Sequence, residues 1–163
     1  MLYLALKLIH VLAVIMFVGN ISVGVFWKAV ADRTKDPKVI AHTMGAIRRA
    51  DRIFTIPGVI LLFIAGLGAA AVARIPVLST GWTLWSLGLL IIAGLAFGPV
   101  ARTQRKIAAL TSGAGRSAAF DWTAYSRLSR LWRSWGLVAL AAPIIAVALM
   151  VLKPALPAFH ATR

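Results

Sequence analysis

Residues 53–73 read IFTIPGVILLFIAGLGAAAVA, a run without one ionisable side chain. At about 1.5 Å of rise per residue, a helix of this length crosses the ~30 Å hydrocarbon layer of a bilayer. The run lacks the two-residue alternation of apolar and polar side chains that strands of a membrane barrel show. Because lipid offers no partner to backbone polar groups, only helices and closed barrels span it, and the run predicts a transmembrane helix.

Three other runs repeat this pattern. Residues 81–101 and 134–153 are apolar and almost free of charge, and residues 2–27 have the length although they carry a lysine and a histidine. The chain is 61% apolar and 13% charged, with a mean hydropathy of +0.88, beyond what a soluble domain covers with polar surface. We predict an all-α membrane protein, a four-transmembrane-helix bundle in which residues 1–163 form a single integral membrane domain.

The net charge of +14 is concentrated in two connections between the predicted helices. The basic residues of the first are Lys28, Arg33, Lys35, Lys38, Arg48, Arg49 and Arg52, and those of the other are Arg102, Arg105, Lys106, Arg116, Arg127, Arg130 and Arg133. The short connection between the second and third helices has only Arg74. By the positive-inside rule the two basic connections face the cytoplasm and both termini lie outside.

We therefore expect a multi-pass protein of the bacterial inner membrane, with basic connections that meet anionic lipid headgroups. Insertion topology and lipid already explain this alternation of basic loops, so we expect no nucleic-acid partner. Small residues four apart, such as Gly94 with Gly98, permit close helix packing. The same holds for Gly66 with Ala70 and Ala142 with Ala146. This spacing fits contacts within one bundle, a homodimer, or another membrane protein partner.

Both basic connections contain apolar residues at helical spacing. They are Val39, Ile40, Met44 and Ile47 in the first, and Trp122, Tyr125, Leu128, Trp132 and Trp135 in the other. This pattern indicates amphipathic cytoplasmic helical segments that lie at the headgroups. Asp121 stands where a helix N-cap is expected. Tryptophans near the predicted helix ends are expected to be interfacial anchors. They are Trp27, Trp82, Trp85, Trp132 and Trp135.

Lys7 and His10 are the ionisable groups well inside an apolar run, and they share one helix face. Lys7 is long enough to reach the outer surface. His10 is not, so its imidazole either hydrogen-bonds a neighbouring helix or ligates a metal. The sharper hypothesis is that His10 is an axial ligand of haem b, with Met150 as second ligand and Lys153 beside a propionate. The alternative for Met150 is packing.

Other chemistry has little support. Cysteine is absent, which excludes thiolate metal sites, iron–sulfur clusters and covalent haem attachment. The carboxylates Asp32, Asp36, Asp51 and Asp121 all fall in the basic connections, which predicts no buried acid for a proton relay and disfavours transport. Gly113 to Gly115 is too short for a phosphate-binding loop. The stretch Thr111 to Gly115 predicts a loop within one domain. Asn20 is expected to bond between helices.

Four segments carry a likeness to a known family. They read LKLIH at residues 6–10, ADRIFTIP at 50–57, GPV at 98–100 followed by Gln104, and LMVLKP at 149–154. In this order the chain resembles a bacterial family of predicted integral membrane proteins of unknown function (DUF2269). The resemblance implies a four-helix membrane fold and no established activity.

That family is more distantly similar to HemJ-type protoporphyrinogen oxidases and CopD-type copper-resistance proteins. In HemJ-type proteins a lysine-x-x-histidine opening is thought to contribute to haem binding, and this likeness implies that role for Lys7 and His10. Ser86 and Phe97 stand where the HemJ-type third helix has a lysine and a histidine. The likeness therefore does not extend to protoporphyrinogen oxidation.

Two functions follow as hypotheses. The first is an accessory or assembly component of the inner membrane without an activity of its own. The second is a b-type haem-binding redox protein with His10 as axial ligand. The sequence leaves open whether the protein is an enzyme.

Overall fold

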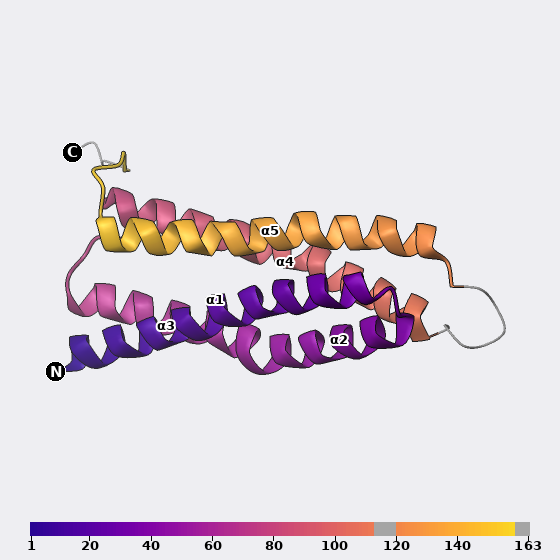
Figure 1. Cartoon of the computed structure of the whole chain (residues 1–163). Coiled ribbons are helices and arrows are strands. Elements are labelled where there is room, and N and C mark those ends of the chain that lie inside the picture. Colours follow the sequence, from indigo (N-terminus) through magenta and orange to yellow (C-terminus); the bar gives the residue numbers. More distant parts are fainter. Residues whose placement is uncertain (113–119, 159–163) are drawn as a thin grey trace.

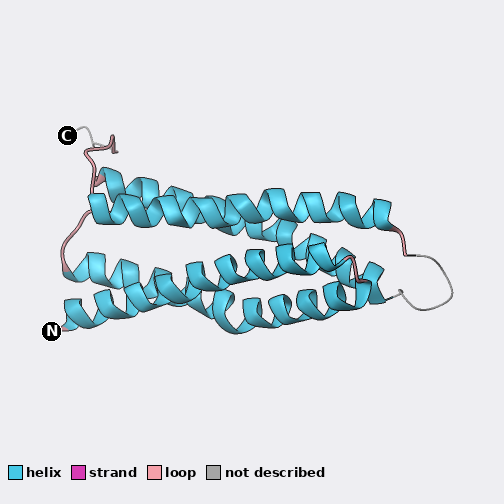
Figure 2. Ribbon diagram, in the orientation of Figure 1, coloured by secondary structure: helices cyan, strands magenta, loops and turns pink. Residues whose placement is uncertain are grey.

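The computed structural model describes residues 1–112 and 120–158, and these ranges contain helices and connections but no strand (Figure 2). The elements are α1 (Leu2–Thr34), α2 (Pro37–Ala50), the π-helical turn η1 (Asp51–Thr55), α3 (Ile56–Val72), α4 (Gly81–Ser112) and α5 (Trp122–Leu152). The described residues contain four helical stretches that are long and apolar enough to span a membrane. The predicted all-α class with four candidate spans is therefore confirmed. The predicted loop at Thr111 to Gly115 is wrong in its first two residues, because Thr111 and Ser112 still belong to α4. Thr111 donates to the carbonyl of Ile107 one turn back, and residues 113–115 lie outside the described residues.

The helices extend well beyond the apolar runs that predicted them. α1 continues past residue 27 to Thr34, α4 continues past residue 101 to Ser112, and α5 begins at Trp122 and not at residue 134. Hydropathy marks the part of a helix that suits lipid, whereas a helix ends where its backbone is capped. Asp121 provides such a cap, since its carboxylate accepts a hydrogen bond from Ala124 N at 2.9 Å as expected.

The second span is interrupted by one π-helical turn. Pro57 has no N–H to donate to the carbonyl of Ile53, and its ring would crowd that carbonyl in a regular helix. In η1 the N–H of Ile56 instead bonds Asp51 O, five residues back. The wider turn lets the chain run from α2 into α3, so the prediction of a separate second helix from residue 53 is corrected to one long element.

The four spans lie side by side, with the N-terminus and the end of α5 at one end of the bundle (Figure 1). α1 packs along α3, and α4 packs along α5 and reaches α2. The opposite part of the bundle holds the end of α1, all of α2 with η1, the end of α4 and the start of α5, and it carries most of the exposed basic side chains. We call it the basic end.

The core of the basic end shows what the amphipathic segments do. Ile40, Met44 and Ile47 of α2 are buried against Ile107 of α4 and Trp132 of α5. The apolar stripe of α2 thus packs inside the bundle and does not form a separate helix lying on the headgroups. Trp132 is 4% exposed, so its expected role as a lipid anchor is wrong. The tertiary partners of these stripes could not be read from their spacing.

Candidate functional site

His10 makes a specific contact between α1 and α3. Its Nδ1 lies 2.9 Å from the carbonyl oxygen of Leu62, which can only accept, so Nδ1 is the donor. The ring lies against Gly66, where an added Cβ would be 2.8 Å from both Nδ1 and Cε1. The hydrogen bond between helices, one of the two alternatives for His10, is therefore present. Because this bond occupies Nδ1, Nε2 is the ring atom left for a metal.

The other residues of the haem hypothesis make no polar or ring interaction with His10 among the described residues. Lys153 caps α5 and stands over the ring of Trp82, 5.5 Å from its centroid. Met150 is half-buried on α5, and Lys7 is exposed on α1. Within residues 1–112 and 120–158 no hydrogen bond, ion pair or ring contact joins His10 to these three residues. The same ranges hold no cluster of three or more metal-ligating His, Cys, Asp or Glu side chains.

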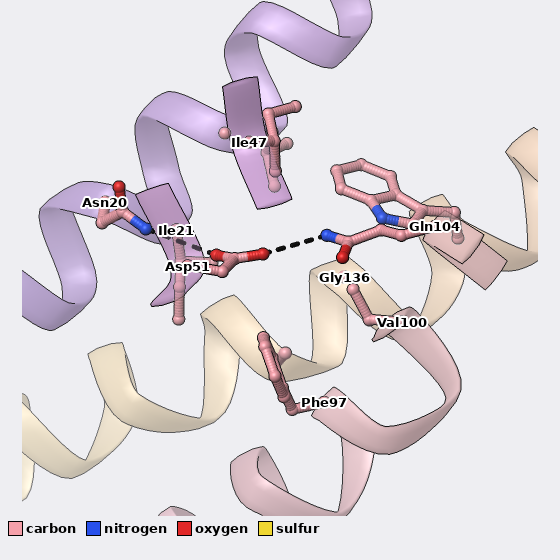
Figure 3. Close-up of a pocket in the computed structure, with 12 residues that line it drawn as sticks. Asn20, Ile21, Ile47, Asp51, Phe97, Val100, Gln104 and Gly136 are labelled. Atoms are coloured by element: carbon pink, nitrogen blue, oxygen red, sulfur yellow. Dashed lines mark hydrogen bonds between the residues drawn. The ribbon is translucent and has the colours of Figure 1, made fainter. Parts of the chain in front are cut away.

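A buried polar network centred on Asp51 joins three of the spans (Figure 3). Asn20 of α1 donates from Nδ2 to Asp51 Oδ1 at 3.3 Å and to Thr55 Oγ1 at 2.8 Å. Gln104 of α4 donates from Nε2 to Asp51 Oδ2 at 3.0 Å. Thr55 donates to Asp51 Oδ1 at 3.1 Å. Each donor is neutral, so Asp51 is held by hydrogen bonds and not by an ion pair.

The network overturns one expectation and bears out another. Asp51 is 9% exposed, so the prediction that the chain has no buried carboxyl group is wrong. It failed because the basic residues Arg48, Arg49 and Arg52 placed the segment in a cytoplasmic connection, whereas α2 and η1 join it to the second span and turn Asp51 inward. The expected inter-helix bond of Asn20 is present. Asp51, Thr55 and Gln104 also belong to the segments that carry the family likeness, which was the signal that could have found the network.

A small cavity of about 30 Å³ lies beside this network. Its lining includes the polar side chains of Asn20, Asp51 and Gln104 (Figure 3), together with Trp132 and apolar side chains such as Phe97 and Val100. Among the described residues, the indole Nε1 of Trp132 is a buried donor without a hydrogen-bond partner. An unsatisfied buried donor beside a carboxyl group in a polar cavity is unusual for a purely structural core.

A larger groove of about 340 Å³ lies between α1 and α2 and shares Asn20, Gly24 and Ile47 with the small cavity. Its other lining residues include Trp27 and His42. The groove is within the size range of small-molecule sites. The two spaces are neighbours, because they share the three lining residues Asn20, Gly24 and Ile47.

A second buried cluster is centred on Lys28, which is 2% exposed. Its Nζ pairs with Asp32, at 2.6 Å from Oδ1 and 2.7 Å from Oδ2. Ser129 and Tyr125 of α5 both bond to this pair, with Lys28 Nζ 2.9 Å from Ser129 Oγ and 3.1 Å from Tyr125 Oη. The ammonium also lies 5.6 Å from the ring centroid of Trp132. The sequence had placed Lys28 among the loop cations, so this link from α1 to α5 was missed.

The basic end otherwise presents unpaired cations. Its exposed basic residues are Arg33, Lys35, Lys38, Arg49, Arg52, Arg102, Arg105, Lys106, Arg127, Arg130 and Arg133. The carboxylates there are already engaged, because Asp32 pairs with Lys28, Asp51 is buried, and Asp36 and Asp121 cap helices. Lys28–Asp32 is the one ion pair in the described part of the chain. The surface charge of this end is thus available to an anionic partner.

Comparison with known proteins gives one finding. The model of a family described as "Predicted integral membrane protein (DUF2269)" matches residues 4–154. No curated protein and no solved structure matches the chain.

Proposed function

Because the chain belongs to this family of predicted integral membrane proteins, we propose that it is an accessory or assembly component of the bacterial inner membrane. Its basic end faces the cytoplasm and docks an acidic region of a membrane partner. The observation that carries this proposal is the set of exposed, unpaired cations at the basic end. The two buried polar clusters have their hydrogen bonds within the bundle, which supports a structural framework more than a catalytic centre.

The proposed docking is electrostatic in origin. Complementary charge steers partners and fixes their orientation, and its effect falls as salt is raised. Anionic phospholipid headgroups meet the same surface at the edge of the bilayer. A second copy of this chain is a poor partner for this end, because both copies would present cations.

Neutralising part of the basic end tests the proposal. With Arg102, Arg105 and Lys106 replaced by Gln, we expect the complex in mildly solubilised membranes to weaken about tenfold, because three surface charge pairs at ~0.5 kcal/mol each are lost. Native-mass analysis at low and high salt measures the change. Arg74→Gln, at the opposite end, is the matched control and should leave the complex intact.

Two results would contradict the docking proposal. One is a wild-type protein that runs with lipid alone or as its own oligomer at every salt concentration. The other is a complex that survives the triple substitution unchanged.

The second candidate function is binding of a b-type haem through His10, and the geometry of one hydrogen bond favours it. A metal-ligating histidine commonly donates its other ring N–H to a carbonyl, which fixes the ring. His10 Nδ1 makes such a bond to Leu62 O. The fit is partial, because no hydrogen bond or ion pair joins Met150 or Lys153 to His10 in the described part of the chain, so the proposal rests on a single axial ligand. A bound haem would supply one-electron redox chemistry.

Two substitutions of His10 separate ligation from packing. His10→Asn keeps an N–H donor that can reach the Leu62 carbonyl, whereas His10→Ala removes both the donor and the ligand. We expect the purified wild type to show a Soret band and a reduced alpha band, and both variants to lose them. The haem proposal would be contradicted by a colourless wild type from haem-replete cells. It would also be contradicted by an unchanged spectrum in His10→Asn.

A further inference from the structure

The indole N–H of Trp132, a residue that lines the small cavity, lacks a hydrogen-bond acceptor. Trp132 is 4% exposed, and its Nε1 has no hydrogen-bond partner among the described residues. The cavity that it lines also contains the Asp51 carboxyl and the side-chain amides of Asn20 and Gln104. Burying a polar donor without a partner is unfavourable, so a ligand that accepts from Nε1 would stabilise this arrangement.

The chemistry of the cavity selects the ligand. A volume of about 30 Å³ holds one or two water molecules and nothing larger. A bare cation is disfavoured, because the unpartnered indole N–H needs an acceptor and a cation cannot accept a hydrogen bond. Water both accepts from Trp132 Nε1 and donates to Asp51, so it matches both partners.

We propose that this cavity binds water, and that the water lets the Asp51 carboxyl group exchange its proton with the solution through the groove between α1 and α2. The step is a simple transfer. A hydronium ion gives its proton to a carboxylate oxygen and becomes water, and the reverse step returns the proton. No electron moves and no other reactant is needed. This inference goes beyond the accessory role and does not depend on it.

The route is supported by the side chains that the two spaces share. Asn20, Gly24 and Ile47 line both the cavity and the groove, and Asn20 bonds directly to Asp51. Gly24 has no side chain, and a Cβ there would lie 3.6 Å from Ile47 Cγ2. Gly24 of α1 thus lies close to Ile47 of α2 at the boundary that the two spaces share.

The side chains that donate hydrogen bonds to Asp51 are neutral, so none of them forms an ion pair with its carboxyl group. These side chains are Asn20 of α1, Thr55 of η1 and Gln104 of α4. Trp132 of α5 lines the same cavity and is also neutral. His42 of α2 is the titratable side chain that lines the groove. Lys28 stands near the ring of Trp132, but its charge is paired with Asp32.

Carbodiimide labelling of the full-length protein in membranes tests the proton site. A hydrophobic carbodiimide takes up the proton of a neutral carboxyl group, its carbon is attacked by the carboxylate oxygen, and rearrangement leaves a stable acylurea. We expect mass spectrometry to find this adduct on Asp51, and Asp51→Asn to abolish it. The absence of an adduct on Asp51 between pH 5 and pH 8 would overturn the proposal.

Infrared spectroscopy tests the route. The infrared band of the Asp51 carboxyl group is the one that disappears in Asp51→Asn. We expect the frequency of this band to shift within seconds after the protein is transferred to heavy water. Ala46 is exposed and lines the groove, so Ala46→Trp should slow this shift at least tenfold. Ala29 is exposed on α1 and does not line the groove, and Ala29→Trp should leave the rate unchanged. Equal rates in both variants would show that the proton does not use this groove.

Resonance Raman spectroscopy of the indole tests the water itself. The difference spectrum between wild type and Trp132→Phe isolates the band that responds to hydrogen bonding at Nε1. We expect that band at the position of a hydrogen-bonded indole. A band position typical of a free N–H would show that no water bonds to Nε1 and would contradict the proposal.

Discussion

Replacing Lys28 by Met should lower the free energy of unfolding by about 3–5 kcal/mol, the usual cost of removing one partner of a buried ion pair. Lys28 is 2% exposed and bonds Asp32, Ser129 and Tyr125. Methionine fills similar space but leaves Asp32 without a cation in a site that α5 covers. Unfolding of the detergent-purified protein by a graded denaturing detergent measures the change.

Two companion variants make this result interpretable. Lys35 is exposed at the end of α1, so Lys35→Met should change stability by less than ~0.5 kcal/mol. Replacing Lys28 by Met together with Asp32 by Asn should recover part of the loss, because no unpaired charge then remains. A loss under ~1 kcal/mol for Lys28→Met would mean that the cluster is solvated and does not hold α1 to α5.

Replacing Asp51 by Ala should lower the free energy of unfolding by about 2–4 kcal/mol. The substitution removes the acceptor for Asn20, Thr55 and Gln104, and each buried group left without a partner costs about 1–3 kcal/mol. Asn20 and Thr55 still bond each other at 2.8 Å, which limits the total. The same detergent-denaturation measurement applies.

Two further variants allow the loss of stability in Asp51→Ala to be compared with that of a conservative change and of a surface change. Asp51→Asn keeps an acceptor oxygen for one donor and should cost less than half as much. Asp36 is exposed and caps α2 by accepting from Lys38 N at 2.8 Å, so Asp36→Ala should cost about 1 kcal/mol. If Asp51→Ala proved no worse than Asp36→Ala, the network would not contribute to holding the three spans together.

The candidate site was only partly visible in the sequence. His10 stood out, because a histidine deep in an apolar run is costly without a partner, and its bond to Leu62 O was one of the two alternatives foreseen. Asn20 was expected to bond between helices, and it does. Asp51 was misplaced, because its basic neighbours indicated a cytoplasmic connection in which a carboxylate would be exposed. A local average of hydropathy cannot show that one side chain of a charged helix faces inward.

The sequence by itself determined the membrane environment, the helical class and the four candidate spans, because lipid requires long apolar helices and rules out open strand edges. It also determined that the basic residues cluster between particular spans. Only the tertiary structure decided that Lys28, Asp51 and Trp132 are buried and that the apolar stripe of α2 packs on α4 and α5. Burial of these groups depends on contacts between residues far apart in the chain, such as Asp51 with Gln104 and Lys28 with Tyr125. Such contacts arise when the helices assemble, and local composition does not encode them.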